Sequence, residues 1–340
     1  MRSICKAGIW ILICYLFSSC SKSGMNPNTG NNQGSKTTDT TKSITQVTTP
    51  PITTIINNKT YTVSNPLILN GAHDMVINGL EIKNPTDICI FLVNCYNITI
   101  KNCNLGPSLQ TGVELHNCTN IKVDSCVMSN ISTGMYALDS SGIQFTNNDV
   151  ENVQGPFPKG AMVQFDDVSG TGNRVLNNRC ENISGQSNPE DVISMYKSNG
   201  TKADPIQITG NLIRGGGPSR TGGGIMLGDN GGSYIIAENN ILVNPGNYGM
   251  AIAGGNNLQI INNMIYSSQT TVSNVGIYIW NQSSGGCSLN TISNNQVNWT
   301  MFNGQSNNSW DNGNCGTVLG WNTNLWGANL SPDILPAQLF

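Results

Sequence analysis

The sequence predicts an all-β solenoid, namely a single-stranded parallel β-helix of about nine stacked coils. The first supporting observation is composition, because the 340 residues include 38 glycines and only 10% charged residues, whereas an ordinary globular domain has about 25% charged residues. Such a composition favours short strands joined by tight polar turns over helices. The second observation is a short pattern that recurs along the chain at intervals of 22 to 33 residues, which is typical of a solenoid.

The recurring pattern consists of two or three strand-forming residues, a polar pair and further apolar residues, as in residues 100–105 and 292–297. The shortest repeats, of 22 to 24 residues, suit three short strands and three turns, and each coil buries its apolar face by stacking on its neighbours. We interpret the asparagines at the second polar position as an inward, structural stack whose amides are satisfied by adjacent coils. The residues at this position are Gly79, Cys103, Cys126, Asn148, Asn178, Asn211, Asn240, Asn263 and Asn295.

A second strand in each coil shows alternation of apolar and polar residues, as in residues 112–116 and 276–280. Over roughly residues 56–300 the repeat resembles the pectate-lyase-like superfamily of right-handed parallel β-helices. The resemblance implies a right-handed coil. It does not imply one reaction, because lyases, hydrolases and non-catalytic proteins share this fold.

The N-terminal residues predict an exported protein. Arg2 and Lys6 precede an apolar run that is too short to span a bilayer comfortably, so residues 1–19 are predicted to be a signal peptide. The small residues Ser18 and Ser19 before Cys20 resemble a bacterial lipobox, which implies lipidation of Cys20; an ordinary secretory signal is the alternative. Both interpretations place the mature protein outside the cytoplasm, and the first anchors it to a bacterial membrane or cell surface.

The remaining boundaries follow from composition. Residues 20–55 are rich in Thr, Ser, Asn and Gly and predict a flexible tether. Residues 56–300 form the predicted β-helix, and residues 301–340 are predicted to be a C-terminal cap to which Trp299, Trp310, Trp321 and Trp326 contribute. Cys287 and Cys315 could form a disulfide in an oxidising compartment. The net charge of −3 provides no basic field for nucleic acid, and we expect a monomer that meets the membrane only through its lipid.

Charge concentrates in the longest coils, between residues 148 and 240. Residues 151–230 hold 15 of the 35 charged residues of the chain. Insertions in a solenoid leave the coil as loops, usually on one face, and loops on a rigid scaffold commonly carry function. We therefore expect a substrate cleft here, although solvated loops would also be charged.

One row of polar residues suggests hydrolysis. If Lys197 stands between Asp166 and Asp229, the two aspartates lie about 9.6 Å apart, twice the distance between adjacent strands, and inverting glycosidases hold their carboxyl groups roughly 6.5–9.5 Å apart. The segments Asp166-Asp167, Glu190-Asp191 and 222–228 resemble motifs of polygalacturonase-type hydrolases. That resemblance implies acid and base roles for Asp166 or Asp167, Glu190 and Asp191. The histidine and the Arg-x-Lys motif of that family have no counterpart here.

The pattern also fits β-elimination on a uronate-containing glycan, which needs a base and a cation that neutralises the uronate. Lys197 is the predicted base, Arg220 could assist it, and Lys159 and Arg214 are predicted to bind substrate. Asp166, Asp167 and Asp191 could hold Ca²⁺ through oxygen ligands.

Tyr196 and Trp280 could stack on sugar rings. Our leading prediction is a polysaccharide lyase. The alternatives are an inverting glycoside hydrolase that uses paired carboxylates, with Asp229 among them, and a non-catalytic glycan-binding surface protein.

Overall fold

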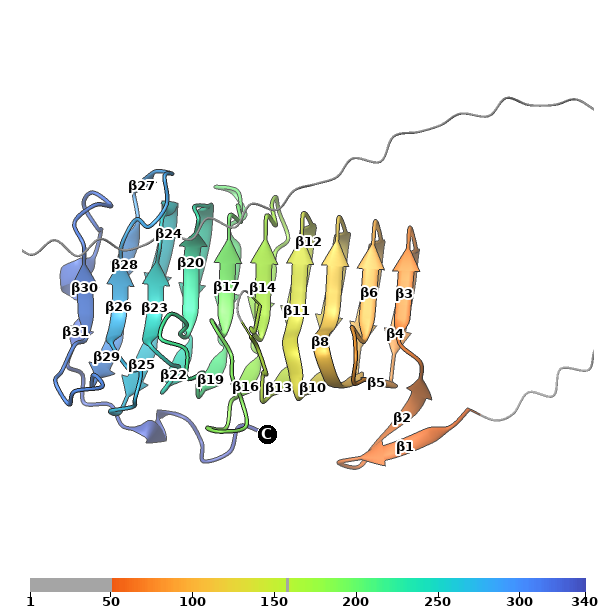
Figure 1. Cartoon of the computed structure of the whole chain (residues 1–340). Helices are drawn as coiled ribbons and strands as arrows, with labels where there is room; N and C mark the ends of the chain where they lie inside the picture. The colour runs from red at the N-terminus through yellow and green to blue at the C-terminus, as the bar shows by residue number, and fades with distance from the viewer. Residues whose placement is uncertain (1–50, 157–158) are drawn as a thin grey trace, which may run out of the picture. The chain divides into compact units, whose positions relative to one another are not determined.

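The computed structural model describes residues 51–156 and 159–340 (Figure 1). The predicted signal peptide, Cys20 and the tether up to residue 50 lie outside this range. The described chain consists almost entirely of short strands, with two 3₁₀ helices, η1 (Trp321–Thr323) and η2 (Pro332–Ile334). None of the helices in the described part of the chain is long and apolar enough to cross a membrane.

Three ladders of parallel strands run along the solenoid, and we call them sheets 1, 2 and 3. The chain enters through an antiparallel hairpin of β1 (Thr53–Ile56) and β2 (Lys59–Ser64). Sheet 1 contains β3 (Leu67–Asn70), β6 (Ile90–Val93), the end of β8 (Asn104–His116), β11 (Ile131–Leu138), β14 (Val163–Asp166), β17 (Ile193–Tyr196), β20 (Ile225–Asp229), β23 (Tyr248–Ile252), β26 (Val275–Ile279) and β30 (Ser309–Asp311).

Sheet 2 contains β4 (His73–Asn78), β7 (Tyr96–Lys101), β9 (Thr119–Asp124), β12 (Ser141–Thr146), β15 (Arg174–Leu176), β18 (Ile206–Thr209), β21 (Ser233–Glu238), β24 (Gly255–Ile261), β27 (Cys287–Ser288) and β28 (Thr291–Ser293). Sheet 3 contains β2, β5 (Leu80–Asn84), the start of β8, β10 (Val127–Ser129), β13 (Asp149–Glu151), β16 (Arg179–Glu181), β19 (Leu212–Arg214), β22 (Ile241–Val243), β25 (Met264–Ser267), β29 (Gln296–Trp299) and β31 (Leu325–Trp326).

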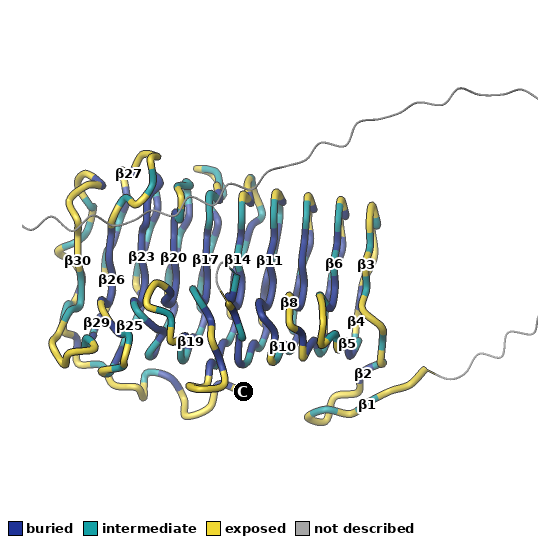
Figure 2. The backbone as a smooth tube through the Cα atoms, viewed as in Figure 1, coloured by how far each residue is buried: buried dark blue, intermediate teal, exposed yellow. Residues whose placement is uncertain are grey.

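The predicted all-β solenoid of parallel coils is confirmed. Sheet 2 has 10 strands, of which β27 and β28 both pair with β24, so it forms the nine rungs that the sequence repeat predicts. Because successive side chains of a strand point to opposite faces, apolar side chains such as Phe165, Met195 and Leu227 point inward and form a buried row. Figure 2 shows buried residues in the sheet 1 strands from β6 to β26, whereas β3 and β30 at the two ends are intermediate or exposed.

The inward asparagine stack is present. The amide Oδ1 of Asn211 accepts hydrogen bonds from the backbone N of Asn178 at 3.0 Å and from its Nδ2 at 2.9 Å. The Asn211 Nδ2 donates to Asn240 Oδ1 at 2.9 Å and to the Val175 carbonyl at 3.0 Å. Asn324 extends the stack by one coil. Each asparagine therefore ties its coil to both neighbours, in surroundings with no access to water.

The corners that follow β6, β8, β11, β14, β17 and β20 of sheet 1 each use a residue in the left-handed backbone region. Asparagine and aspartate adopt this conformation most readily among residues with a side chain. The corner residues are Asn94, Asn117, Asp139, Asp167, Lys197 and Asn230. Lys197, with φ of 47°, is the exception in side-chain type. This row marks the edge of sheet 1 and sets the register of the side chains before it.

The C-terminal residues differ from a simple end cap. Strands β30 and β31 extend sheets 1 and 3 by one rung, and Trp321 and Trp326 pack against the end of the core. Residues 335–340 then run along the outside of sheet 3, where Leu335 and Leu339 pack against Val243 (Figure 1). The structure also contains the Cys287–Cys315 disulfide.

Candidate functional site

A groove lies on the outer face of sheet 1. It consists of two adjoining hollows of about 230 and 200 Å³, which share Thr221, Met226 and Gln282. The corner segments that lead from sheet 3 into β14, β17 and β20 supply Lys159, Glu190 and Arg220 along one side of the groove. Acidic side chains gather in one hollow and aromatic side chains in the other, so the groove has two chemically different halves.

Asp191 lies on the floor of the acidic half. Its carboxylate accepts a hydrogen bond from the Tyr248 hydroxyl and one from the Gly223 backbone N at 3.0 Å. Burial of the carboxyl group, together with the nearby charges of Glu190 and Asp229, raises its pKa to about 7 despite these two hydrogen bonds. Asp191 therefore holds its proton near neutral pH and can donate it to a bound molecule.

The glycine run 222–224 explains how Asp191 is held. A Cβ added to Gly223 would lie 2.7 Å from the Tyr248 ring, and one on Gly222 would lie 2.4 Å from the Glu190 carbonyl oxygen. The absence of side chains thus lets Tyr248 and the Glu190 segment approach closely. The run that resembles a polygalacturonase motif thus supplies one donor to Asp191, the Gly223 N–H, and makes room for the other, the Tyr248 hydroxyl.

Asp229 is the second carboxylate of the acidic half. Burial raises its pKa, and the negative charge of Asp166 adds to the effect. Glu190 stands at the lip of the groove, where its Oε1 accepts a hydrogen bond of 2.5 Å from the Thr221 hydroxyl. Two carboxyl groups in different surroundings, of which one stays protonated near neutral pH, form the arrangement used for acid–base catalysis.

The row that the sequence places along sheet 1 is wrong by one residue. Asp166 and Asp229 do occupy one row, but the residue between them is Tyr196. Lys197 follows at the left-handed corner, in line with Asp167, and its Nζ lies 3.9 Å from the Asp167 carboxylate. The prediction that Lys197 acts from between two aspartates is therefore wrong, because a shift of one residue moves a strand side chain to another face.

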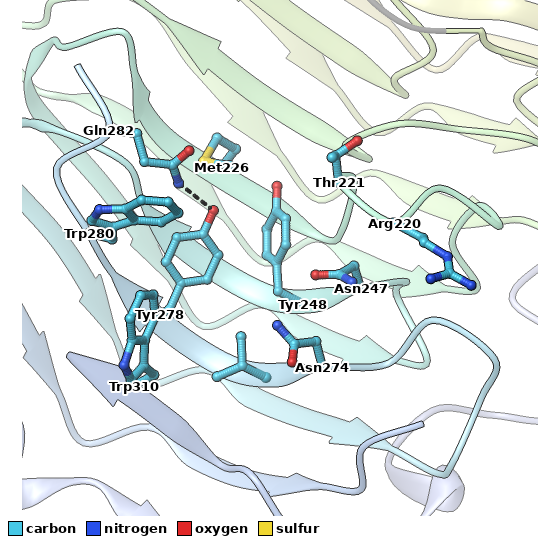
Figure 3. A pocket seen from close by; sticks show the side chains of 11 residues that line it. Arg220, Thr221, Met226, Asn247, Tyr248, Asn274, Tyr278, Trp280, Gln282 and Trp310 are labelled. Carbon is cyan, nitrogen blue, oxygen red and sulfur yellow. Dashed lines mark hydrogen bonds between the residues drawn. The ribbon is translucent and has the colours of Figure 1, made fainter. Parts of the chain in front are cut away.

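The aromatic half of the groove contains Tyr248, Tyr278, Trp280 and Trp310 (Figure 3). The rings of Trp280 and Trp310 meet edge to face, with centroids 5.7 Å apart. Both indoles remain about 40% exposed, at 40% and 42%, so their faces are available to a ligand. The Tyr278 hydroxyl accepts a hydrogen bond from Gln282 Nε2 at 3.1 Å.

Two of the predicted cap tryptophans have other positions. Trp310 belongs to the outer row of sheet 1 because β30 pairs with β26 and places it beside Tyr278. Trp299 is buried in the core, at 0% exposure. The sequence signal that could have identified Trp310 is its place as the outward residue of a short strand, one coil beyond Tyr278.

At the end of the acidic half where Lys159 lies, the charged side chains form ion pairs and hydrogen bonds with one another. Lys159 Nζ lies 3.2 Å from a Glu114 carboxylate oxygen and 4.1 Å from the centre of the Tyr136 ring. Glu114 also contacts His116 Nε2 at 3.0 Å. Asp166 accepts a 2.6 Å hydrogen bond from the Tyr136 hydroxyl. This network makes Lys159 a weak anchor for an acidic ligand, because its charge is largely neutralised.

Arg214 does not lie in the groove. Its side chain is on the outer side of sheet 3, where it pairs with Glu181 at 3.1 Å and donates hydrogen bonds to the carbonyl oxygens of Pro336 and Ala337. The prediction that Arg214 belongs to the same substrate site is wrong. Arg214 instead holds the C-terminal segment in place. This contact joins residues more than 120 positions apart, so the local sequence pattern could not indicate it.

The predicted Ca²⁺ ligands do not form one site. Asp166 accepts from Tyr136, Asp167 stands at the corner beside Lys197, and Asp191 is held by Tyr248 and Gly223. Across residues 51–156 and 159–340, no three His, Cys, Asp or Glu side chains gather as a metal site. The three aspartates thus do not fit the prediction of a shared cation.

Comparison with known proteins identifies the architecture. A family model described as "Right handed beta helix region" matches residues 65–217. The fold is a right-handed parallel β-helix. No curated protein matches the chain. Among solved structures, the catalytic domain of an aspartate-to-alanine variant of a GH87 α-1,3-glucanase in complex with nigerose has a TM-score of 0.56 and 15% identity, over 76% of this chain and 50% of that one.

Two other solved structures have lower scores. The catalytic unit of a thermostable GH87 α-1,3-glucanase from Streptomyces thermodiastaticus has a TM-score of 0.43 and 13% identity, over 77% of this chain and 51% of that one. A tailspike protein of E. coli bacteriophage HK620 in complex with a pentasaccharide has a TM-score of 0.37 and 13% identity, over 72% and 50%. This chain spans about half the length of these proteins, and the likeness concerns the fold alone.

Proposed function

We propose that this protein is an extracytoplasmic enzyme that hydrolyses glycosidic bonds of a neutral polysaccharide. The observation that carries the proposal is the pairing, in one groove, of a carboxyl group with a pKa of about 7, Asp191, and a second carboxyl group, Asp229. Adjacent exposed tryptophans suit sugar rings, whose apolar faces stack on aromatic side chains. Action on a glycan is also what the GH87 α-1,3-glucanase is named for.

The mechanism assigns one proton transfer to each carboxyl group. Asp191 donates its proton to the glycosidic oxygen as the bond from that oxygen to the anomeric carbon breaks. Asp229 accepts a proton from the water whose oxygen bonds to the anomeric carbon. The Tyr248 hydroxyl and the Gly223 N–H then stabilise the carboxylate that Asp191 becomes. Asp229 releases its proton to solvent and Asp191 takes one up, so both groups return to their starting states.

The charges of the groove favour a neutral substrate. Asp191, Asp229 and Glu190 line the acidic half, and the cation that reaches it, Lys159, is paired with Glu114. In this half a uronate would face the Asp229 and Glu190 carboxyl groups beside a lysine whose charge is already paired, which costs energy in a partly buried site. The proposal thus moves away from the lyase that the sequence favoured.

β-Elimination remains a second candidate because Arg220 lines the aromatic half and forms no ion pair with any residue of the described chain. A screen of neutral and uronate-containing polysaccharides distinguishes the two reactions. Hydrolysis releases reducing ends without a new double bond, whereas elimination also produces the ultraviolet absorbance of an unsaturated uronate. Lys197→Ala should leave hydrolysis intact, since Lys197 lies outside the groove. No cleavage of any polymer would contradict both candidates.

The tryptophan pair should contribute to substrate binding. Replacing Trp280 with Ala removes a stacking face and leaves Trp310 unsupported, so KM should rise roughly five- to tenfold, corresponding to about 1 kcal/mol of stacking. The rate kcat should change little. Tyr96→Ala is the matched control, because Tyr96 is 41% exposed but lies on sheet 2. Equal changes in the two variants, measured by steady-state kinetics, would argue against the assignment.

Attachment to a bacterial membrane is a proposal that rests on the lipobox-like sequence before Cys20. With Cys20→Ser, the protein expressed with its own N-terminal residues should move from the detergent-soluble membrane fraction to the aqueous fraction. Retention of the variant in the membrane fraction, with the same phase partitioning as wild type, would exclude a lipid on Cys20.

A further inference from the structure

The side wall of the groove has a low point. The segment that leads from sheet 3 into sheet 1 spans residues 215–224 before β20, residues 244–247 before β23 and residues 268–274 before β26. The middle segment is thus the shortest of the three. In sequence terms, the coil from Asn240 to Asn263 carries no insertion, whereas both of its neighbours do. A short coil between two long ones leaves a gap in the wall, which we call the notch.

The notch is hollow and open to the groove. A cavity of about 260 Å³ lies over the short segment, with Arg220 on one side and Thr271 and Phe302 on the other. It shares Arg220, Asn247 and Asn274 with the aromatic half of the groove. In Figure 3, Asn247 lies between Tyr248 and Arg220, and Asn274 lies below Asn247.

Beyond the notch the hollow widens. A cavity of about 650 Å³ shares Thr271 and Val272 with the notch and extends to the outside of the solenoid. Its lining residues are mostly Asn, Ser, Thr and Gly, and its charged pair, Glu181 and Arg214, is mutually neutralised at 3.1 Å. Such a surface suits the hydroxyl groups of a neutral sugar and offers no anchor for an ion.

The groove and the notch form a three-way junction. The groove continues along sheet 1 in both directions, toward Asp191 on one side and toward Asn307 and Trp310 on the other. A linear chain that lies along the groove therefore does not use the notch. The notch cavity, at about 260 Å³, is at least as large as either half of the groove, at about 230 and 200 Å³, so a space that fits a sugar in the groove has an equivalent in the notch.

From this geometry we propose that the notch is a second glycan-binding arm, which holds a neutral side branch while the backbone of the polymer lies in the groove. The inference rests on the proposed hydrolysis and makes it more specific, because it identifies the substrate as a branched neutral polysaccharide. The branch leaves the backbone at the aromatic half, next to Asn247 and Asn274, which line both the groove and the notch.

Matched polymers test the inference. Each branched polymer is compared with its linear backbone: galactomannan with mannan, arabinoxylan with xylan, and branched β-1,3/1,6-glucan with β-1,3-glucan. Wild-type enzyme should cleave one branched polymer with a kcat/KM at least about tenfold above that for its linear form. Thr271→Trp, which fills the notch with an indole, should reduce this preference to about one. Thr271 is exposed and its side chain makes no hydrogen bond within the described chain.

Thr317→Trp is the matched control, because Thr317 is exposed and lies two residues before Leu319, which pairs with Thr291 of sheet 2. It should keep the wild-type preference. A ratio near one in the wild type, or an unchanged ratio in Thr271→Trp, would overturn the inference while hydrolysis itself stands. If neither form of any polymer is cleaved, the proposed hydrolysis fails. The notch is then tested by electrophoresis of the wild type and of Thr271→Trp in gels that contain the same polymers. A branched polymer that retards the wild type more than its linear form does, and that no longer does so for Thr271→Trp, supports the notch. Equal retardation of the wild type by both forms refutes it.

Discussion

Replacing Asp191 with Asn should lower kcat by roughly 10²–10⁴-fold, the usual contribution of a positioned general acid. The substitution keeps the shape of the side chain and an oxygen that can accept from Tyr248 and Gly223, so the loss reflects the missing proton. Asp167→Asn is the matched control, since Asp167 stands at a corner outside the groove in a conformation that asparagine adopts readily. Steady-state kinetics on the polymer found in the screen provide the measurement.

The pH dependence should carry the same signature. Because the pKa of Asp191 is about 7, kcat/KM should fall about tenfold per pH unit above neutrality as the acid loses its proton. Residual activity of Asp191→Asn should lack this decline. An unchanged decline in the variant, or similar losses of activity in Asp191→Asn and Asp167→Asn, would show that another group is the acid.

Stability should respond to the same group with a definite sign. The pKa of Asp191 in the folded protein lies above the value of an unfolded aspartate, so the folded state binds this proton more tightly. The contribution of this tighter proton binding to the free energy of unfolding is fully present below about pH 4 and is lost as pH rises through about 7. Relative to wild type, Asp191→Asn should therefore become more stable as pH rises across this window, by up to about 1.4 kcal/mol per pH unit. Urea unfolding at several pH values measures the difference, and a pH-independent difference would contradict the raised pKa.

Replacing Asn211 with Ala should lower the free energy of unfolding by roughly 3–5 kcal/mol. The substitution removes a hydrogen-bond partner from the Asn178 backbone N and Nδ2, the Val175 carbonyl and Asn240 Oδ1. The Asn178 Nδ2 keeps the Phe145 carbonyl, and Asn240 Oδ1 keeps the backbone N of residue 211. The loss therefore comes mainly from the buried Asn178 backbone N, since an unpaired buried polar group costs roughly 1–3 kcal/mol, and from the cavity that the missing amide leaves.

Asn312→Ala provides the control for Asn211→Ala, because Asn312 is exposed and its side chain makes no hydrogen bond within the described residues. Its effect should stay within about 0.5 kcal/mol. The two variants are compared by urea unfolding monitored by circular dichroism. A loss below about 1 kcal/mol in Asn211→Ala would show that water replaces the amide.

Much of the site could be named from the sequence and part of it could not. Asp191, Glu190, Asp229, Lys159, Arg220 and Trp280 all line the groove. They were found because insertions and charges concentrate in the same coils. Lys197 was misplaced because Asp166 pairs with Tyr196 in an unbroken register, and a β-bulge between β17 and β20 brings Asp229 to Tyr196 as well. A shift of one residue is enough to move a side chain from a strand face to a corner. Trp310 was missed because its strand has three residues, too few to show alternation.

The sequence by itself determined the solenoid, its nine rungs and the asparagine stack, because each coil repeats the same local pattern and meets only its neighbours. Only the tertiary structure decided which side of a coil each inserted loop occupies, that residues 335–340 return to sheet 3, and that Tyr248 contacts Asp191 across 57 positions. These contacts join segments that share no periodicity. Their geometry depends on side-chain packing across coils, and so does the raised pKa that makes Asp191 the proposed acid.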